Sequence, residues 1–283
     1  MRGASALCRP VTCSSPKPGL IDAQLAALKR LVERSEGQIR LATSISELEA
    51  ARKVQAFSIV LHMEGAEAID PKLDRLERLH AARLRSLGLV WSGAARTIFG
   101  HGVPFAYPRS PDTGLGLSPL GKELVRACDR LGIMIDTSHL NERGFWHVAA
   151  LSSALLVATH TCAHSICRST RNLTDKQLDA VRESRGVVGF NLSVNDVRPD
   201  ANLDANTALD VVVRHIQYLV DRIGEDCVAL GTDFDGAVIP SSIQDASGLP
   251  RLLSALRTHG FSDAMLRKFA LENWLRAFKV IWH

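Results

Sequence analysis

The stretch from Gly132 to His139 reads Gly-Ile-Met-Ile-Asp-Thr-Ser-His, a short apolar run that ends in polar residues. A run without polar–apolar alternation is typical of a strand that is buried on both faces of a parallel sheet. Helical patterns flank it at 120–131 and 144–151. A buried strand between two helices is the repeating unit of an α/β fold, so this stretch predicts that fold class.

The same alternation of apolar runs and helical patterns continues along the chain in both directions. Seven apolar or β-rich runs occur, at 38–43, 57–62, 87–91, 133–138, 154–159, 186–192 and 228–232. Amphipathic helical patterns occupy 21–34, 46–54, 71–84, 120–131, 144–151, 174–184, 208–223 and 249–258. Thr174 is suited to cap the start of a helix, and Gly132 and Gly224 lie just past predicted helix ends.

This order of elements predicts a parallel sheet covered by helices, and a (β/α)8 TIM-type barrel is the leading architecture. A closed barrel needs eight strands, and the seven runs leave it one strand short. Residues 1–19 contain three prolines and no periodic pattern, so we expect an irregular tail there. We therefore predict a single barrel-type domain over 20–283 that is incomplete at its N-terminal side.

The composition agrees with a folded protein and excludes several other classes. Of 283 residues, 46% are hydrophobic and 23% are charged, which excludes a wholly disordered or fibrous chain. The net charge of +4 is small, so we expect no nucleic-acid partner. No apolar stretch approaches the ~18 residues that suggest a membrane span, and no apolar segment of a signal peptide precedes Arg9. Six cysteines without a Cys-x-x-Cys pair predict free thiols in the reducing cytoplasm.

Polar residues gather where the predicted strands end, in the segments 62–65, 136–139, 158–160 and 231–236. In a parallel barrel these ends converge on one face, where active sites are built. Glu64, His139 and His160 form a ligand set that suits zinc and leaves a coordination position for water. Zinc lowers the pKa of that water towards ~7 and so supplies a hydroxide nucleophile. Asp233 would then carry protons near the metal, which predicts hydrolysis of an amide or ester.

Five ordered motifs resemble those of the membrane (renal) dipeptidases, a family of zinc metallopeptidases with a TIM-barrel fold. The motifs are Glu64-Gly-Ala-Glu-Ala-Ile69, Gly132–His139, Ala158-Thr-His160, Arg171-Asn-Leu-Thr-Asp175 and Gly231-Thr-Asp-Phe-Asp-Gly236. The resemblance runs from about Ile21 to the C-terminus. It implies a metallo-dependent hydrolase with two zinc ions that cleaves the peptide bond of a dipeptide. A dipeptide is the expected partner, together with a second copy of the chain in a homodimer.

The resemblance also implies a role for each matching residue. Glu64 would bridge the two zinc ions, and His139 and His160 would ligate the second of them. Arg171 would hold the C-terminal carboxylate of the dipeptide, which suits a planar guanidinium that forms two parallel hydrogen bonds. Asp233 would take a proton from the bridging hydroxide and pass it to the leaving amine. Arg171 rests on the resemblance alone, because its place in the sequence indicates only a surface charge.

The first zinc site of the family is incomplete in this sequence. Its His-x-Asp pair lies on the first barrel strand, whereas no His precedes His62 here and Asp22 is the only Asp before Glu64. We therefore expect this chain to hold at most about one zinc ion, the number that three ligands support. A His-x-Asp pair encoded upstream of Met1 would mean that the start of the chain had been misassigned.

A substrate-contacting position also departs from the family pattern. Trp91-Ser92 stands where the renal-type enzymes have a histidine, and His101 in the same loop is a candidate substitute that would bind substrate. His62 lies two residues before Glu64, so both face the same side of a strand. His62 is either an additional ligand or a buried donor behind the ligands.

The sequence thus predicts a zinc-dependent dipeptidase and leaves two alternatives open. The first is a non-catalytic remnant that keeps the fold without the first metal site and would hold one metal ion or none. The second is another barrel amidohydrolase that acts on a lactone or a cyclic amide, and a substrate panel would separate it from a dipeptidase. Asp136 and Asp235 are interpreted as structural or supporting carboxylates rather than ligands.

Overall fold

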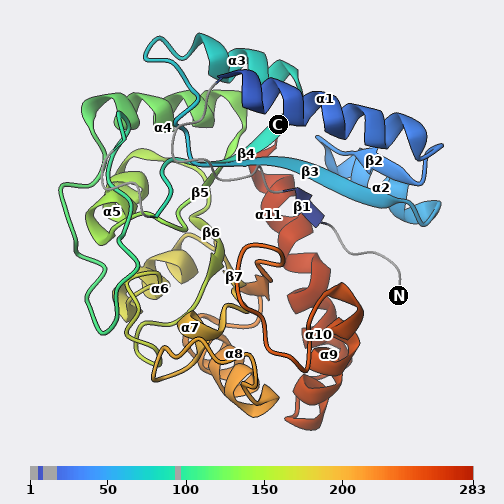
Figure 1. Ribbon diagram of the computed structural model, residues 1–283, viewed down its shortest axis with the longest axis vertical. Helices are drawn as coiled ribbons and strands as arrows, with labels where there is room; N and C mark the ends of the chain where they lie inside the picture. The colour runs from blue at the N-terminus through green and yellow to red at the C-terminus, as the bar shows by residue number, and fades with distance from the viewer. Residues whose placement is uncertain (1–5, 9–17, 93–96, 283) are drawn as a thin grey trace.

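The computed structural model describes residues 6–8, 18–92 and 97–282, and a parallel sheet of eight strands lies at its centre (Figure 1). The strands are β1 (Ala6–Cys8), β2 (Ile39–Leu41), β3 (Phe57–Glu64), β4 (Leu84–Gly88), β5 (Met134–Asp136), β6 (Val157–Thr161), β7 (Val187–Phe190) and β8 (Val228–Leu230). They follow the order β1-β3-β4-β5-β6-β7-β8, and β2 also pairs with β3. Every ladder is parallel, so all strands end at the same edge of the sheet.

Helices connect the strands and cover the outside of the sheet. They are α1 (Pro18–Arg34), α2 (Ile45–Lys53), α3 (Asp74–Ala81), α4 (Pro119–Leu131), α5 (Glu142–Leu151), α6 (Asp175–Glu183), α7 (Val194–Val197), α8 (Leu209–Ile223), α9 (Leu249–Thr258), α10 (Asp263–Arg267) and α11 (Asn273–Ile281). A single 3₁₀ turn precedes α9, and a π-helical turn over 268–272 joins α10 to α11. The alternation confirms the predicted α/β fold of the TIM-barrel type.

The start of the sheet differs from the prediction. All seven predicted strands are present, but β1 lies inside the segment 1–19, so the expectation of an irregular conformation is wrong for residues 6–8. Three residues are too few to show a pattern in the sequence. β1 pairs with β3 from Ala6–Ile59 to Cys8–Leu61, whereas β8 pairs with β7. Within the described ranges no ladder joins β8 to β1, so the sheet is curled but open.

Helix ends lie where the sequence places capping residues. Thr174 forms a capping box with Gln177 at the start of α6. The side chain of Ser118 accepts a hydrogen bond from the first turn of α4, and Gly132 ends that helix with a φ of +64°. Gly224 ends α8 with a φ of +86° and a ψ of 153°, outside the left-handed helical conformation of Gly132. These caps satisfy backbone groups that a helix leaves without partners, so they fix where each connection begins.

Alternating residues of β3 belong to two different hydrophobic clusters. Ile59 and Leu61 pack outward in the cluster that includes the covering helices, whereas Val60 belongs to an inner cluster. The inner cluster joins residues of five strands to the last helix, namely Val60, Met134, Val157, Val187, Ala229, Trp274, Ala277, Phe278 and Ile281. Helix α11 contacts β7, β8 and α2, so it reaches from the last two strands of the sheet to the helix that precedes β3. Apolar side chains therefore fill the interior at the end where the strands begin.

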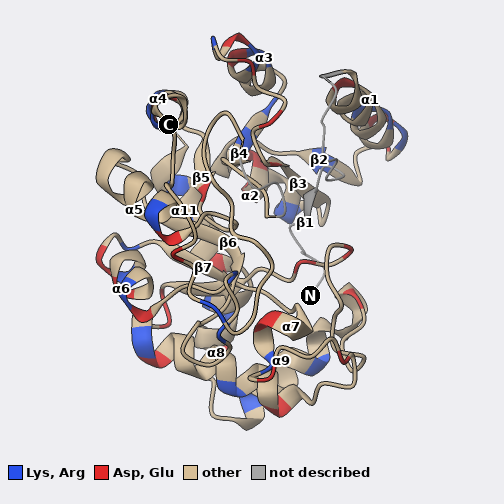
Figure 2. Cartoon of the chain, turned by 60° about the vertical axis from the view of Figure 1, so that its left-hand side comes forward, with Lys and Arg blue, Asp and Glu red and all other residues tan. Residues whose placement is uncertain are grey.

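Charged residues of both signs are interspersed on the outer helices (Figure 2). Between α6 and α8, Arg222 pairs with Asp175 and Asp179, and its Nη2 lies 2.6 Å from Asp179 Oδ2. Surface pairs of this kind contribute ~0–1 kcal/mol each, so burial of the two clusters dominates stability. Of the helices in the described ranges, none combines the length and the apolar character needed to cross a membrane.

The close packing of β6 and β7 generates the first prediction. A Cβ atom at Gly189 would lie 1.9 Å from the carbonyl oxygen of Thr159, whereas a Cβ atom at Gly19 would have no neighbour within 4 Å. We expect Gly189→Ala to lower the free energy of unfolding by about 1–3 kcal/mol or more, since overpacking has this effect. Gly19→Ala, in the first turn of α1, is the matched control and should leave it unchanged or raise it by up to about 1 kcal/mol, because Ala favours a helix more than Gly does. Urea denaturation measures both, and wild-type stability of Gly189→Ala would contradict the packing.

Candidate metal centre and substrate site

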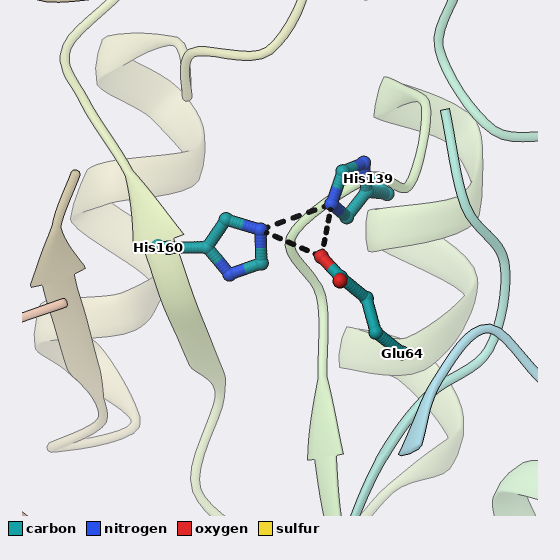
Figure 3. A group of neighbouring side chains, drawn as sticks. All are labelled: Glu64, His139 and His160. Atoms are coloured by element: carbon teal, nitrogen blue, oxygen red, sulfur yellow. Dashed lines mark hydrogen bonds and ion pairs between the residues drawn. The ribbon is translucent and has the colours of Figure 1, made fainter. Parts of the chain in front are cut away.

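Three buried side chains from the ends of three strands face one another (Figure 3). Glu64 ends β3, His160 lies in β6, and His139 follows β5; we call these residues the triad. His139 Nε2 is 2.7 Å from Glu64 Oε1 and 2.9 Å from His160 Nε2. His160 Nε2 is 3.1 Å from Glu64 Oε1. Each residue is only 6% exposed, so the fold brings the three predicted ligands together away from bulk water.

His139 is held in place by its backbone and by Ser92. Its φ of +52° lies in the left-handed region, which costs about 1–2 kcal/mol for a residue other than glycine. The backbone N–H of Ser92 donates to His139 Nδ1 at 3.2 Å, and Ser92 Oγ lies 2.7 Å from the same atom. Ser92 is completely buried. The loop after β4 therefore fixes the orientation of this ring.

Burial and charge set the protonation states of the triad. Burial disfavours the ionised form of Glu64, but its polar contacts with His139 and His160 hold the pKa of the carboxyl well below its usual range. Burial, together with the positive charge of Arg171, lowers the pKa of His139. At neutral pH, Glu64 is therefore a carboxylate and His139 a neutral imidazole. These are the forms in which the two side chains bind metal ions.

The triad fits a divalent metal of the zinc type. Its three potential ligand atoms lie within 4.8 Å of one another, and no other such group occurs in the described part of the chain. Imidazole nitrogen and carboxylate oxygen are ligands that zinc accepts, and three of them leave a position for water or substrate. Ligation through His139 Nε2 requires the ring proton on Nδ1, so binding of a metal there would replace the hydrogen bond from the Ser92 backbone N–H to Nδ1 by one from Nδ1 to the Ser92 hydroxyl.

Arg171 reaches the triad from the segment that follows β6. Its guanidinium donates to the carbonyl oxygens of Ser138 and His160 at 3.4 and 3.3 Å, and its Nη2 lies 3.4 Å from His139 Nε2. The residue is 5% exposed. Within the described ranges no carboxylate forms an ion pair with it. A buried guanidinium that no carboxylate of the described ranges holds in an ion pair is suited to bind an anionic group of a ligand.

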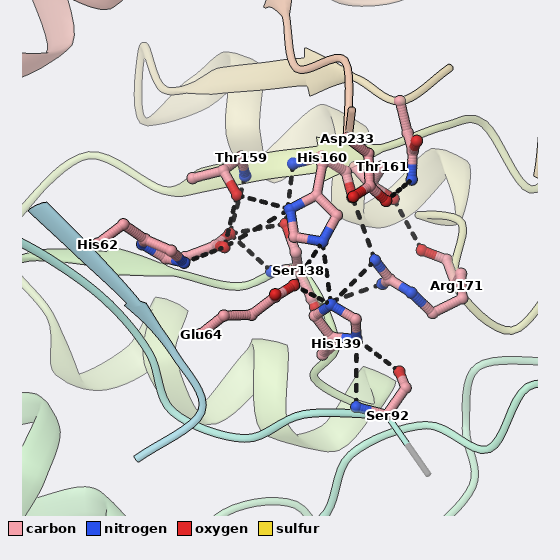
Figure 4. Close-up of polar contacts among 12 residues, drawn as sticks. His62, Glu64, Ser92, Ser138, His139, Thr159, His160, Thr161, Arg171 and Asp233 are labelled. Atoms are coloured by element: carbon pink, nitrogen blue, oxygen red, sulfur yellow. Dashed lines mark hydrogen bonds and ion pairs between the residues drawn. The ribbon is translucent and has the colours of Figure 1, made fainter. Parts of the chain in front are cut away.

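Asp233 lies at the same edge of the sheet, after the end of β8 (Figure 4). It is half-buried, its φ is +60°, and its Oδ2 accepts a hydrogen bond from Asn191 Nδ2 at 3.3 Å. The buried carboxyl of Asp196 lies within electrostatic reach of both Arg171 and Asp233. Burial raises the pKa of Asp196, and the charges of Asp233 and Arg171 act on it in opposite directions.

The loop after β4 places an aromatic side chain, rather than His101, beside the triad. The Trp91 ring lies 5.8 Å from the His139 ring and 5.6 Å from Phe105, measured between ring centroids. The His101 ring lies next to Gly114. No contact between the His101 ring and the triad is found in the described ranges, and its role in substrate binding stays a prediction.

A second layer of buried polar residues lies behind the triad. His62 Nδ1 is 2.8 Å from Ser86 Oγ, and His62 Nε2 is 3.8 Å from Asp136 Oδ2. His62 is not part of the group of potential ligand atoms, so its contacts are those of a residue behind the ligands. Thr159 Oγ1 bonds Asp136 Oδ2, and it also bonds His160 Nδ1 (Figure 4). The sequence predicted no role for Thr159 or Ser92 themselves, although Thr159 adjoins His160 and Ser92 lies at the register of the substrate-contacting histidine of the family.

Comparison with known proteins identifies the family of the chain. Residues 5–282 match the model of the membrane dipeptidase family, peptidase family M19. The chain belongs to the membrane dipeptidase family. This confirms the resemblance expected from the five motifs. As a family member the chain is a metallo-dipeptidase, and the triad is its candidate metal site.

Solved structures in the membrane dipeptidase family share the fold closely. A metallo peptidase from Rhodobacter sphaeroides, with a bound phosphinate mimic of the dipeptide L-Ala-D-Ala, is 45% identical with a TM-score of 0.92. The match covers 99% of this chain and 79% of that one. The metallo peptidase called dipeptidase AC is 42% identical with a TM-score of 0.93, over 99% and 86% of the two chains. A protein from the pqqA 5′ region of Klebsiella pneumoniae is 44% identical over 259 residues, which is 92% of this chain and 95% of that one.

The triad generates a prediction about bound metal. After loading with Zn²⁺ and removal of the excess, we expect the chain to retain about one metal ion, the number that three ligands support. His160→Ala should lose it, because only two ligands remain. His164→Ala is the matched control, since its ring contacts the Arg109 carbonyl outside the triad. Elemental analysis measures the content, and full retention by His160→Ala would place the metal elsewhere.

Proposed function

We propose that this chain is a zinc dipeptidase that hydrolyses the peptide bond of a dipeptide. Glu64, His139 and His160 would hold one zinc ion, Arg171 would bind the C-terminal carboxylate of the substrate, and Asp233 would transfer the proton. The observation that carries the proposal is the position of the Arg171 guanidinium. Its Nη2 lies 3.4 Å from His139 Nε2, so a cation for the substrate carboxylate adjoins the candidate ligands.

The position of Arg171 favours cleavage of the last peptide bond of a substrate. In a C-terminal residue, the amide nitrogen and the carboxylate carbon are only two bonds apart, each of about 1.5 Å. A carboxylate bound to Arg171 therefore brings the adjoining peptide bond to the triad. The dipeptide mimic bound to the Rhodobacter sphaeroides relative supports a substrate of this size.

The proposed chemistry assigns one task to each residue. Zinc bound to the triad would polarise the scissile carbonyl and lower the pKa of a water ligand to ~7. Asp233 would accept the proton that water releases when its oxygen bonds to the carbonyl carbon. It would then donate this proton to the nitrogen as the C–N bond breaks. Arg171 would hold the carboxylate still throughout, and the products are two amino acids.

Hydrolysis of a lactone or cyclic amide is the alternative activity. Such substrates need no free carboxylate next to the scissile bond. Their hydrolysis would therefore leave the buried guanidinium of Arg171 without an anionic group to bind. The absent His-x-Asp pair leads us to propose one zinc ion rather than two. A remnant without catalysis would bind metal in the same way and would hydrolyse no dipeptide, so turnover separates it from the proposed enzyme.

The role of Asp233 generates a prediction about rate. We expect Asp233→Asn to lower the turnover of a dipeptide by ~10²–10⁴-fold, because general acid–base residues contribute that much, while bound zinc stays nearly unchanged. Asp235→Asn, two residues away and exposed, is the matched control and should keep most of the rate. Steady-state kinetics with parallel metal analysis test this. A wild-type rate for Asp233→Asn would remove the residue from the mechanism.

The role of Arg171 generates a prediction about substrate binding. Arg171→Lys keeps the charge but loses the two parallel hydrogen bonds to a carboxylate. We therefore expect a strong rise in KM for dipeptides and a much smaller change for dipeptide amides. Arg168→Lys, at an exposed position, is the control and should change neither. Equal effects of Arg171→Lys on free and amidated dipeptides would show that Arg171 does not bind the carboxylate.

A further inference from the structure

A single buried carboxylate, that of Asp136, lies between the two segments that carry the histidines of the triad. Its Oδ1 accepts from Ser138 N at 2.9 Å, from Ser138 Oγ at 2.7 Å and from Thr159 N at 2.8 Å. Its Oδ2 accepts from Thr159 Oγ1 at 2.6 Å. Asp136 is 2% exposed. All four hydrogen-bond partners donate to Asp136, and His62 Nε2 lies 3.8 Å from its Oδ2, so Asp136 acts purely as an acceptor.

The hydrogen bonds of Thr159 then determine where His160 carries its ring proton. A hydroxyl group has one proton, and Thr159 Oγ1 gives it to Asp136, which can only accept. Thr159 Oγ1 must therefore accept from His160 Nδ1, which lies 2.8 Å away. In a neutral imidazole the network thus assigns the proton to Nδ1 and leaves the lone pair on Nε2. That lone pair faces His139 and Glu64 (Figure 4).

We propose that Asp136 is a positioning residue that acts through Thr159 to keep His160 in the tautomer able to bind metal. The inference rests on the proposed function, because the metal that His160 would ligate belongs to it. Asp136 itself would not touch the metal or the substrate. Its effect is to fix the proton of a ligand through one intervening hydroxyl. Partners of this kind change metal affinity by ~10–100-fold when they are replaced.

His139 provides an internal contrast. Its Nδ1 receives the backbone N–H of Ser92, and the Ser92 hydroxyl, which can donate or accept, lies beside it. Since the backbone N–H can only donate, a neutral His139 carries its proton on Nε2, and its tautomer has to change before Nε2 can bind metal. Of the two histidines, His160 is the one whose lone pair is directed at the triad before metal arrives.

The proposal predicts an unusual result for Asp136→Asn. Three donors converge on the Oδ1 position and one on the Oδ2 position, so the amide oxygen of Asn should stay at the first and its NH₂ should face Thr159. The NH₂ would donate to Thr159 Oγ1, and the hydroxyl would then donate to His160 Nδ1. The proton of His160 would move to Nε2, the atom that has to bind metal. We expect Zn²⁺ affinity to fall by at least ~10–100-fold.

A second substitution separates this mechanism from simple damage. Thr159→Val removes the hydroxyl that transmits the effect, so the Asp136→Asn/Thr159→Val double variant should bind Zn²⁺ more tightly than Asp136→Asn alone. Damage that is merely structural would make the double variant weaker than either single one. Thr159→Ser keeps the hydroxyl and should keep an affinity close to that of the wild type, whereas Thr159→Val alone should lose part of it.

Two measurements on the full chain test the inference. Competition with a chromophoric chelator gives Zn²⁺ affinity, and ¹⁵N NMR of histidine-labelled, metal-free protein reports which ring nitrogen of His160 is protonated. We expect Nδ1–H in the wild type and in Thr159→Ser, and Nε2–H in Asp136→Asn. Retention of Nδ1–H in Asp136→Asn, or additive losses in the double variant, would overturn the proposal.

The same experiment distinguishes failure of the inference from failure of the proposed function. The NMR measurement needs neither metal nor activity, so it tests the Asp136–Thr159–His160 chain alone. A wild-type chain that shows Nδ1–H but has no dipeptidase activity would overturn the function and support the chain of hydrogen bonds. If Asp136→Asn does not fold, the Thr159→Val and Thr159→Ser pair still decides, because equal tautomers and affinities in the two would overturn the inference.

Discussion

Parallel pairing of β3 to β8 is the constraint on which the site depends. It places the carboxyl ends of all these strands at one edge, so residues distant in the sequence become neighbours there. Glu64 and His160 are 96 residues apart in the chain, yet their side chains are 3.1 Å apart. At the opposite end, α11 and the inner apolar cluster fill the curled sheet. The polar side chains of the site therefore lie at one edge of the sheet. Because they are buried there, each hydrogen bond is electrostatically stronger than it would be in water.

The three ligands of the candidate site could be predicted because strand ends are visible in the sequence. An apolar run predicts a buried strand, and a His or Glu at the end of that run is predicted to lie at the carboxyl edge of the sheet, as for Glu64 and His160. Arg171 had no such marker. Its burial depends on how the segment after β6 turns back over the carbonyl groups of Ser138 and His160. Only resemblance to a family could indicate it.

Other parts of the structure could not be predicted because they depend on contacts between distant segments. Ser92 acts on His139 from 47 residues away, and nothing in its own neighbourhood indicates this. Strand β1 is defined by its pairing with β3 rather than by its composition. Helix α11, by contrast, is indicated by the sequence, because the aromatic residues Trp274, Phe278 and Trp282 recur every four residues along it and at its C-terminal cap. Their rings stack with centroid distances of 6.0 and 4.2 Å.

The positive φ angles of His139 and Asp233 have a consequence for how this protein can change over generations. Both residues adopt a conformation in which glycine is favoured by about 1–2 kcal/mol. Selection of variants for thermal stability alone would favour glycine at both positions, and glycine cannot perform the roles proposed for the two side chains. Engineered libraries should therefore keep these two residues unchanged, because substitutions that raise stability at these positions are expected to lower activity.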